Sequence, residues 1–484
     1  MDQDLLSIQE ARDLSTRAFE AWKIWSKASQ EQVDQVCAAM ATAAFNAAER
    51  LGQMAHEETG YGVPAHKRLK NEFAAQNVWN SIKDIKTVGV IRHDIEKRTY
   101  EIAWPMGVVA ALTPSTNPTS TVIYKILIAV KARDAIIVAP HPSAAKCSYE
   151  AAALMARVAE QNGAPPGLIA CMQRVSLSGT QELMNHKYVA LILATGGTPM
   201  VRAAHSTGKP AYGVGPGNVP AYVDRSADVE KAARYIVASK SFDCSTICAT
   251  EQAVVADRPI AQRLRDLMVK EGAYFTDEGQ TERLRALLFN TEGGMVTSTV
   301  GKPAITLAAM AGFAVPPGTR VLVAPLERVG REEPLSREKL TTVLGWYEAD
   351  GWEAGCERCI ELIQFGGRGH SLVIHATDEN VIMAFGLEKP VFRIAVNTMS
   401  SLGAIGLTTG VYPSLTLGAG GVGGSITGDN VTTYHLFNVK RLAYEMTPPP
   451  PAALLAGAAP QGITPEEIER VVRGVVQEIL TLKR

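Results

Sequence analysis

The sequence predicts an α/β protein of more than one domain, built on open parallel sheets. Its 484 residues exceed what a single hydrophobic core usually supports, so we expect two or three domains. A strand pattern at residues 108–112, a polar turn, a helix pattern at 119–133 and a strand pattern at 135–139 follow one another. This alternation is typical of the strand–helix–strand unit of a parallel sheet.

Composition and charge exclude several classes of function. Hydrophobic residues make up 46% of the chain, and a formal net charge of −1 offers no basic field for a nucleic acid. No apolar run reaches the roughly 18 residues that span a bilayer. The opening MDQDLLSIQEARDLS lacks the pattern of a targeting signal, and the seven irregularly spaced cysteines argue against a disulfide framework. We therefore expect a cytoplasmic protein without nucleic-acid or membrane partners.

The pair Cys356 and Cys359 has the spacing of two metal ligands. A zinc site needs four, and no second CxxC or HxxxH lies at a suitable distance along the chain. The surrounding WEAGCERCIELIQ has the pattern of an ordinary helix, so we predict no metal site.

Helices and then a hairpin are predicted ahead of the first parallel strand. Residues 6–85 have a helical pattern, and Ser29 with Gln32 three positions on is a start signal of the capping-box type. Strand patterns on both sides of residues 91–97 indicate a hairpin that projects from its domain. We assign these helices a structural role only.

Two small-residue turns could bring the backbone close to a ligand. After a strand pattern at 189–193, the turn ATGGT contains Gly196 and Gly197, which would let a pyrophosphate approach the start of the next helix. Taken alone this signal is weak, because it is not GxGxxG and no acidic residue follows about 20 positions on. The segment KPAYGVGPGNVPAYV, residues 209–223, holds a second and more rigid turn.

Cys248 is the candidate nucleophile. It lies in the polar segment SKSFDCSTICAT, directly before QAVVAD, which has the pattern of a buried strand. Most cysteines are inert buried side chains, and Cys244 fits that interpretation. Cys248 differs because its neighbours Thr246, Ile247, Ala249 and Thr250 offer little bulk to cover it, so its thiol could be held rigidly at the mouth of a strand and still be reached.

The pattern FDxxxICAxEQ around Cys248 resembles the catalytic-cysteine segment of the CoA-acylating aldehyde dehydrogenases, the acetaldehyde and propionaldehyde type. The resemblance runs from about residue 10 to about residue 446. It implies an aldehyde dehydrogenase-like fold with two Rossmann-like open parallel sheets and a small β oligomerisation arm. The domains that it implies are a dinucleotide-binding domain (residues 1–86 and 105–224), an oligomerisation arm (87–104 and 430–446) and a catalytic domain (225–429).

The resemblance also implies roles for individual residues. Cys248 would attack the carbonyl, and Asn117 with the Cys248 backbone N–H would hold the oxyanion, although Asn117 could equally be a helix cap. His370, in the turn GGRGHS, would act as a base toward the CoA thiol, against the alternative of a structural histidine. The implied NAD-binding residues are Thr113, Pro114, Pro140, His141, Thr195, Gly196, Gly197, Thr198, Gly215, Pro216, Gly217 and Glu338, the last contacting the ribose unless it is simply solvated.

The turn after residue 211 separates two reactions within this family. Hydrolytic members carry a glutamate just ahead of the corresponding turn, where it activates water, whereas this chain has Tyr212, Gly213 and Val214. We therefore predict oxidation of propionaldehyde or acetaldehyde with NAD and CoA, through a cysteine thioester. The alternatives are a hydrolytic aldehyde dehydrogenase, an acyl-phosphate (semialdehyde) reductase and a non-catalytic scaffold. The resemblance further implies a homodimer or homotetramer, with the glycine-rich residues 397–430 lining the substrate and CoA entrance.

The last 38 residues lie outside the resemblance. Residues 447–462 form a Pro/Ala/Gly linker, and residues 463–484 an amphipathic helix that begins with Thr464, Pro465 and Glu467. Its apolar positions are Ile468, Val471, Val472, Val475, Val476, Ile479 and Leu480. Such a tethered helix resembles the encapsulation peptides that recruit enzymes into bacterial microcompartments by binding shell protein. The alternative is a helix that packs on its own protein body.

Overall fold

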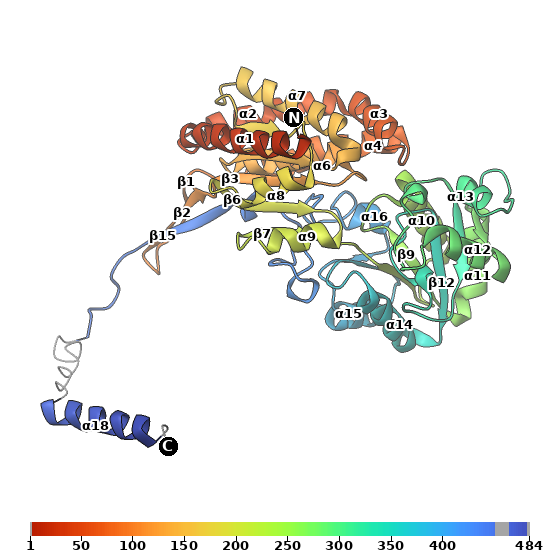
Figure 1. Cartoon of the computed structure of the whole chain (residues 1–484). Coiled ribbons are helices and arrows are strands. Elements are labelled where there is room, and N and C mark those ends of the chain that lie inside the picture. Colours follow the sequence, from red (N-terminus) through yellow and green to blue (C-terminus); the bar gives the residue numbers. More distant parts are fainter. Residues whose placement is uncertain (1, 451–463, 482–484) are drawn as a thin grey trace. The chain divides into compact units, whose positions relative to one another are not determined.

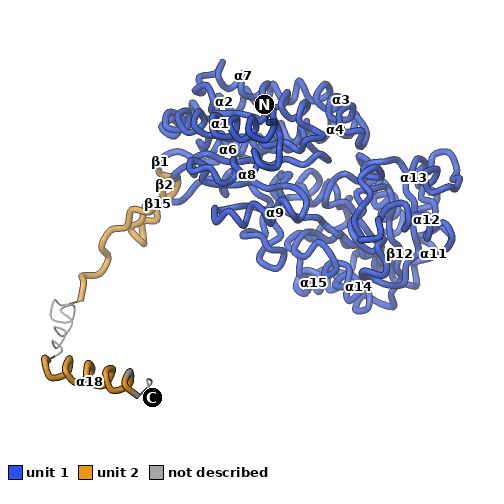
Figure 2. Tube along the Cα trace, in the orientation of Figure 1, with its two compact units in different colours: residues 1–89, 103–439 blue, residues 90–102, 440–484 orange. Residues whose placement is uncertain are grey.

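The fold is described from a computed structural model, in which residues 2–450 and 464–481 can be described. The chain divides into two compact units, drawn in different colours in Figure 2. The larger contains residues 1–89 and 103–439, and the smaller contains residues 90–102 and 440–484. Both parallel sheets and the cavities described below belong to the larger unit.

Helices form the N-terminal part of the larger unit, as predicted. They are α1 (Gln3–Trp25), α2 (Gln30–Asn46), α3 (Ala48–Thr59), α4 (Pro64–Glu72), a π-helical turn (Phe73–Asn77) and α5 (Val78–Ile82). Ser29 and Gln32 form the predicted capping box at the start of α2. The glycine in the left-handed conformation at Gly60 ends α3, and Pro64 begins α4.

The first sheet has five parallel strands in the order β5-β4-β3-β6-β7. Figure 1 labels β3, β6 and β7 of this sheet. The strands are β3 (Val108–Thr113), β4 (Ala135–Pro140), β5 (Ile169–Cys171), β6 (Val189–Thr195) and β7 (Ala211–Val214). The helices between them are α6 (Pro118–Lys131), α7 (Ala145–Gln161), α8 (Leu177–Asn185) and α9 (Thr198–His205). Every residue of α6 is buried, and Lys125 on it donates to the carbonyls of Leu112 and Leu193 at 2.7 and 2.9 Å. The predicted strand–helix–strand unit is therefore confirmed.

The second sheet has seven parallel strands in the order β10-β11-β12-β9-β8-β13-β14. The strands are β8 (Val219–Val223), β9 (Glu251–Asp257), β10 (Ala273–Phe275), β11 (Val321–Pro325), β12 (Val343–Ala349), β13 (Leu372–His375) and β14 (Ile394–Val396). The helices are α10 (Val229–Ser241), α11 (Arg258–Lys270), α12 (Glu278–Leu288), α13 (Ala304–Met310), α14 (Gly351–Phe365), α15 (Glu379–Glu388) and α16 (Ser400–Gly403). Short 3-10 turns are Pro142–Ala144, Phe242–Ser245, Thr297–Thr299, Pro334–Ser336, Gly421–Gly423 and Thr433–His435.

Strand β8 is the first strand along the chain that belongs to the second sheet. It pairs with β9 and β13, so the chain enters the second sheet between Val214 and Val219, earlier than the predicted boundary at residue 224. Consecutive residues of β8 point to opposite faces of the sheet, so Tyr222 packs in one hydrophobic cluster and Ala221 in the other. The change of sheet therefore falls within the second glycine turn.

A three-stranded sheet of order β1-β2-β15 contains the predicted hairpin. Its strands are β1 (Gly89–Asp94), β2 (Thr99–Pro105) and β15 (Phe437–Ala443), and the Asp94 carboxylate accepts from the backbone N–H of Lys97 at 3.0 Å in the turn. Helix α18 (Pro465–Thr481) begins with the predicted capping box of Thr464 and Glu467. Most of the predicted linker, residues 451–462, lies outside the described residues, as do Ile463 at the start of the predicted helix and the side chain of Ile479.

Two further predictions concern the absence of sites. Cys356 and Cys359 lie on α14 as predicted, and the described part of the chain holds no group of three His, Cys, Asp or Glu side chains that could bind a metal ion. No helix among the described residues is long and apolar enough to cross a membrane.

Candidate active site

Most of the predicted site residues line one cavity of about 260 Å³ at the carboxyl edge of the first sheet. This is the edge where open parallel sheets bind ligands. The predicted residues in its lining are Pro114, Asn117, His141, Thr195, Gly196, Gly197, Gly215, Pro216, Cys248 and Glu338. The apolar part of the lining was not predicted from the sequence and includes Ile247, Leu340, Ile405, Leu415 and Leu417.

A second cavity of about 220 Å³ shares part of this lining. Thr113 and Pro140, register partners at the ends of β3 and β4, line it together with Gly196 and Gly197. The Thr113 hydroxyl is buried and has no hydrogen-bond partner in the described structure, so it is a polar group that a bound molecule could satisfy. Gly197 precedes α9 without a side-chain cap, and Thr198 is the first residue of that helix.

Cys248 lies between a 3-10 turn and β9, and its side chain is half-buried. Burial, and next the Glu338 carboxylate, raise the pKa of the thiol to about 12, while Arg393 lowers it. In this state Cys248 is therefore a neutral thiol that must lose a proton before it attacks. Cys244 is buried, as expected, and burial raises its pKa to about 11.

Asn117 directly precedes α6 but makes no capping hydrogen bond to it. Its Nδ2 donates to the Thr246 carbonyl at 2.9 Å and to the Thr116 hydroxyl at 3.2 Å. Its Oδ1 accepts a hydrogen bond from the Lys70 ammonium. The side chain is thus held toward the Cys248 segment, and the helix-cap alternative is not what the structure shows.

Glu338 lies beside both Cys248 and the second glycine turn. Its Oε1 accepts from the Gly217 backbone N–H at 3.0 Å, and burial raises its pKa to about 7. A Cβ at Gly217 would lie 2.2 Å from the Cys248 carbonyl oxygen and 3.1 Å from the His370 ring, so only glycine fits there. The turn therefore packs directly against the cysteine backbone.

His370 lies behind this turn and does not line either cavity. Its side chain is buried, Nδ1 lies 3.1 Å from the Ser371 hydroxyl, and Nε2 has no partner in the described structure. Burial, with a contribution from Arg393, lowers the pKa of His370 to about 3. In this arrangement the imidazole is neutral and a weak base. The predicted role of His370 toward CoA stays a prediction.

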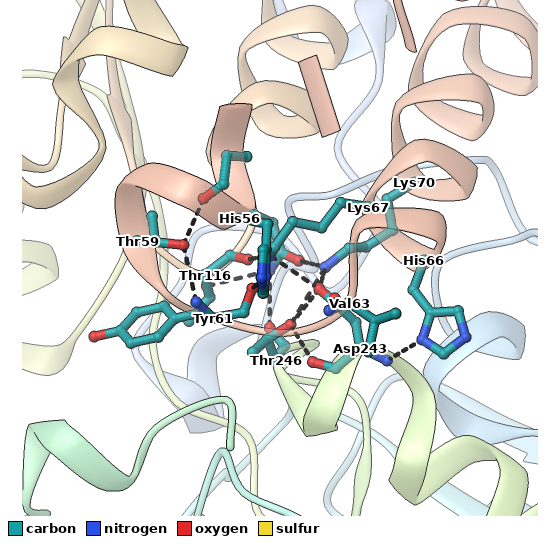
Figure 3. Close-up of polar contacts among 12 residues, drawn as sticks. His56, Thr59, Tyr61, Val63, His66, Lys67, Lys70, Thr116, Asp243 and Thr246 are labelled. Atoms are coloured by element: carbon teal, nitrogen blue, oxygen red, sulfur yellow. Dashed lines mark hydrogen bonds and ion pairs between the residues drawn. The ribbon is translucent and has the colours of Figure 1, made fainter. Parts of the chain in front are cut away.

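Lys67, Lys70 and Asp243 form a buried charged cluster that was not predicted from the sequence (Figure 3). Lys70 joins this cluster to Asn117. Lys67 and Lys70, one turn apart on α4, both reach Oδ2 of Asp243, Lys67 at 3.1 Å. The same carboxylate accepts from the Val63 backbone N–H at 2.7 Å and from the Thr246 hydroxyl at 2.6 Å. Desolvation would raise the pKa of Asp243, but the two ammonium groups outweigh it and lower this pKa to about 2.

The backbone at this cluster is strained. Asp243, Cys244 and Ser245 have φ values of 47°, 51° and 65°, three consecutive non-glycine residues in the left-handed region. Each such residue costs on the order of 1–3 kcal/mol and persists only where its surroundings fix it. The four donors on Asp243 supply that constraint, so the cluster holds the turn that carries Cys248 and Thr246.

A half-buried thiol that shares a cavity with an amide donor and a carboxylate is an arrangement typical of enzymes with a nucleophilic cysteine. The model of the aldehyde dehydrogenase family matches residues 5–278. The chain is 43% identical over 409 residues to an aldehyde-alcohol dehydrogenase of Streptococcus pneumoniae, which covers 83% of this chain and 46% of that protein. The chain spans about half the length of the first curated relatives that it matches.

Two solved structures are similar over nearly the whole chain. An acetylating aldehyde dehydrogenase from Geobacillus thermoglucosidasius has 50% identity and a TM-score of 0.92, covering 93% of this chain and 99% of its own. A propionaldehyde dehydrogenase from the fucose utilisation bacterial microcompartment of Clostridium phytofermentans has 30% identity and a TM-score of 0.82, covering 89% and 96%. The chain belongs to the aldehyde dehydrogenase family, and its similarity is to the acetylating type that the segment around Cys248 predicted.

Proposed function

We propose that the protein oxidises a short, uncharged aldehyde with NAD and CoA, and so produces an acyl-CoA and NADH. The observation that carries this proposal is that Cys248, Asn117 and Glu338 line one cavity. Similarity to an acetylating aldehyde dehydrogenase over 93% of the chain supports acyl transfer to a thiol. The alternatives of a hydrolytic enzyme, an acyl-phosphate reductase and a scaffold lack a comparable observation.

Each of the three residues has a task in the chemical step. Glu338, whose pKa is about 7, takes the proton of the Cys248 thiol, and Sγ bonds to the aldehyde carbon. An N–H of Asn117, with the Cys248 backbone N–H, holds the oxygen as it becomes negative. When NAD is bound it accepts the hydride, which leaves a thioester on Cys248. The CoA thiolate then attacks this carbonyl, the bond to Sγ breaks, and Cys248 is released.

The second cavity suits the dinucleotide. The unpartnered Thr113 hydroxyl and the uncapped start of α9 offer hydrogen-bonding groups to its phosphates and sugars. Nothing lies within 4 Å of a Cβ built on Gly215, so that side of the turn is open. Glu338 then has a second task, predicted from the resemblance, in contacting the nicotinamide ribose.

The lining of the cavity favours an uncharged aldehyde. Of the residues that line it, none is a lysine or an arginine. The nearby Arg393 does not line the cavity, and its Nη groups donate to Gly428 O at 2.9 Å, to Asn430 Oδ1 at 3.2 Å and to Gly418 O. A carboxylate or sulfonate tail would therefore be buried without a cationic partner, which is costly. We expect kcat/KM for propionaldehyde to exceed that for succinic semialdehyde by about 10²-fold or more.

NADH formation from propionaldehyde and NAD, with and without CoA, tests the proposal. We expect turnover that requires CoA and yields propionyl-CoA. The Cys248→Ala variant should lose turnover and still bind NAD, whereas Cys244→Ala, a change in the same segment, should keep turnover. Turnover without CoA would indicate the hydrolytic reaction, and CoA-dependent NADH formation by Cys248→Ala would refute the assigned nucleophile.

Assembly with other chains is proposed on separate grounds. In α18 the side chains of Ile468, Val471, Val472, Val475, Val476 and Leu480 are exposed, and the relative from Clostridium phytofermentans comes from a microcompartment. We propose that residues 463–484 bind shell protein, and that residues 87–104 with 430–446 form the arm of a homodimer or homotetramer. Deleting residues 447–484 should keep activity and abolish co-purification with shells, whereas Arg470→Ala should keep both. Loss of activity in the deletion would argue against a targeting role.

A further inference from the structure

We infer that Lys70 is a positioning residue for the reaction, because it fixes which end of the Asn117 amide is presented to the substrate. The inference rests on the oxyanion role proposed for Asn117. An asparagine side chain can hold either its N–H groups or its carbonyl oxygen toward a ligand, and only the N–H groups stabilise an oxyanion. The orientation of this one amide therefore decides whether the cavity can support the reaction.

The contacts of Asn117 permit one orientation. Its Oδ1 accepts from the Lys70 ammonium, while Nδ2 donates to the Thr246 carbonyl at 2.9 Å. A 180° rotation of the amide would turn its N–H groups against the ammonium and its oxygen against the Thr246 carbonyl. Both new contacts would be repulsive. The second Nδ2 hydrogen makes the longer contact, 3.2 Å to the Thr116 hydroxyl, and is the one that a substrate oxygen can take.

Lys70 itself has little freedom to move. Its side chain is 2% exposed, and its ammonium also contacts the Asp243 carboxylate and, at 3.3 Å, the Thr246 hydroxyl. Asp243 is fixed in turn by the Val63 backbone N–H and by Lys67. Three segments far apart in sequence, α4, the start of α6 and the turn before Cys248, thus converge on one amide. A cation on Oδ1 also polarises the amide and makes its N–H groups stronger donors.

Lys67 offers a matched comparison within the same cluster. It has the same side chain on the same helix face, is 2% exposed, and contacts Asp243 at 3.1 Å. Its other contact is the backbone carbonyl of Thr116 at 3.2 Å, and no contact joins it to the Asn117 amide. If Lys70 acts through Asn117, substitution of Lys70 should lower kcat more than the same substitution of Lys67, even if the two variants lose similar stability.

A double-mutant cycle tests the inference. Wild type, Lys70→Met, Asn117→Ala and the double variant are compared in kcat for NADH formation, after circular dichroism and a thermal melt have verified folding. We expect Asn117→Ala to lose about 10²- to 10³-fold and Lys70→Met about 10- to 100-fold. In the Asn117→Ala background, Lys70→Met should lower kcat by less than about twofold, because the amide that Lys70 orients is absent. Lys67→Met should lose less than Lys70→Met.

Two outcomes would overturn the inference: an unchanged kcat in Lys70→Met, or the same fold-loss in both backgrounds, which indicates a role independent of Asn117. If Lys70→Met does not fold, Lys70→Gln, which keeps an N–H donor without the charge, completes the same cycle with a smaller loss. An inactive wild type would instead count against the proposed function. The tests are therefore distinguishable.

Discussion

Two carboxylates near Cys248, Asp243 and Glu338, differ in almost every physical respect. Asp243 is fully buried and accepts from two ammonium groups, a hydroxyl and a backbone N–H, which lower its pKa to about 2. Glu338 accepts one backbone N–H, lines the cavity, and has its pKa raised by burial to about 7. Two groups with nearly the same ordinary pKa are therefore about five pH units apart.

The difference in pKa indicates that the two carboxylates have different roles. A carboxylate that stays ionised at every working pH can hold strained backbone and orient neighbours, but it cannot accept a proton usefully. A carboxylate that titrates near neutrality can exchange protons with a thiol beside it. We therefore expect Asp243 to serve structure and orientation, and Glu338 to serve the chemical step.

Removing the charge of Asp243 should have the largest effect. Asp243→Asn leaves Lys67 and Lys70 buried without a counter-ion and weakens the constraint on three left-handed residues. We expect the free energy of unfolding to fall by about 3–5 kcal/mol, as for other broken buried ion pairs, and turnover to be lost. Urea unfolding followed by tryptophan fluorescence measures the first, and NADH formation the second.

A matched control uses an exposed pair. Glu182 pairs with Arg12 at 2.9 Å, where Arg12 is 54% exposed, so Glu182→Gln should change stability by less than about 1 kcal/mol. Because the pKa of Asp243 is lowered, the stability that it contributes is present above about pH 4 and is lost as the pH falls toward 2. The variant should lack this part of the acid dependence. Equal stability of Asp243→Asn and wild type would contradict the assigned role.

Glu338→Gln should lower kcat without lowering the free energy of unfolding, and in this respect it should differ from Asp243→Asn. A raised carboxyl pKa means that the folded state binds more protons than the unfolded state between about pH 4.5 and 7, so ionised Glu338 costs stability above that range. We expect the variant to be at least as stable as wild type at pH 8. Its kcat should fall by about 10² or more, and the rise of kcat through pH 7 should disappear. A higher KM for NAD with kcat retained would support the ribose contact alone.

How much the sequence could predict differs between the two carboxylates for a physical reason. Cys248 and the glycine turns lie in short segments whose residue types depart from the pattern of an ordinary strand or helix, and Glu338 was predicted from the resemblance of its segment to a known family. Lys67 and Lys70 lie three residues apart on a helix, which is the spacing of a solvated face, and their partner Asp243 is more than 170 residues away. Local periodicity predicts strands and helices well, but it does not reveal which polar face another segment will bury.

The position of β8 shows a related limit. An apolar strand pattern identifies the strand, but strands of either parallel sheet are buried on both faces and have the same pattern. The assignment of β8 to the second sheet depends on its pairing with β9 and β13. The boundary predicted at residue 224 therefore fell after β8, whereas the change of sheet comes before it.

Thiol labelling tests whether Glu338 is needed because the resting cysteine is protonated. With a pKa of about 12 for Cys248, the thiolate fraction rises about tenfold for each pH unit through the working range. In the absence of NAD and aldehyde, we expect the rate of alkylation by iodoacetamide to rise steadily from pH 6.5 to 9, without a plateau. Mass spectrometry of the labelled peptide, with Cys248→Ala as the blank, assigns the site. A plateau below pH 8 would mean a thiolate that needs no proton acceptor.

The smallest expected effect is a loss of activity above about pH 8, caused by deprotonation of Lys70. Burial outweighs the attraction of Asp243 and lowers the pKa of Lys70 to about 8, with Lys67, His66 and Cys244 as its other titratable neighbours. Above that pH a neutral Lys70 no longer enforces the orientation of Asn117. We expect the rate of the first NADH turnover without CoA, which excludes ionisation of the CoA thiol, to fall several-fold between pH 7.5 and 9. The fall should persist in Lys67→Met and be absent in Asn117→Ala. A first-turnover rate that stays level to pH 9 in wild type would mean that the charge on Lys70 does not matter to Asn117.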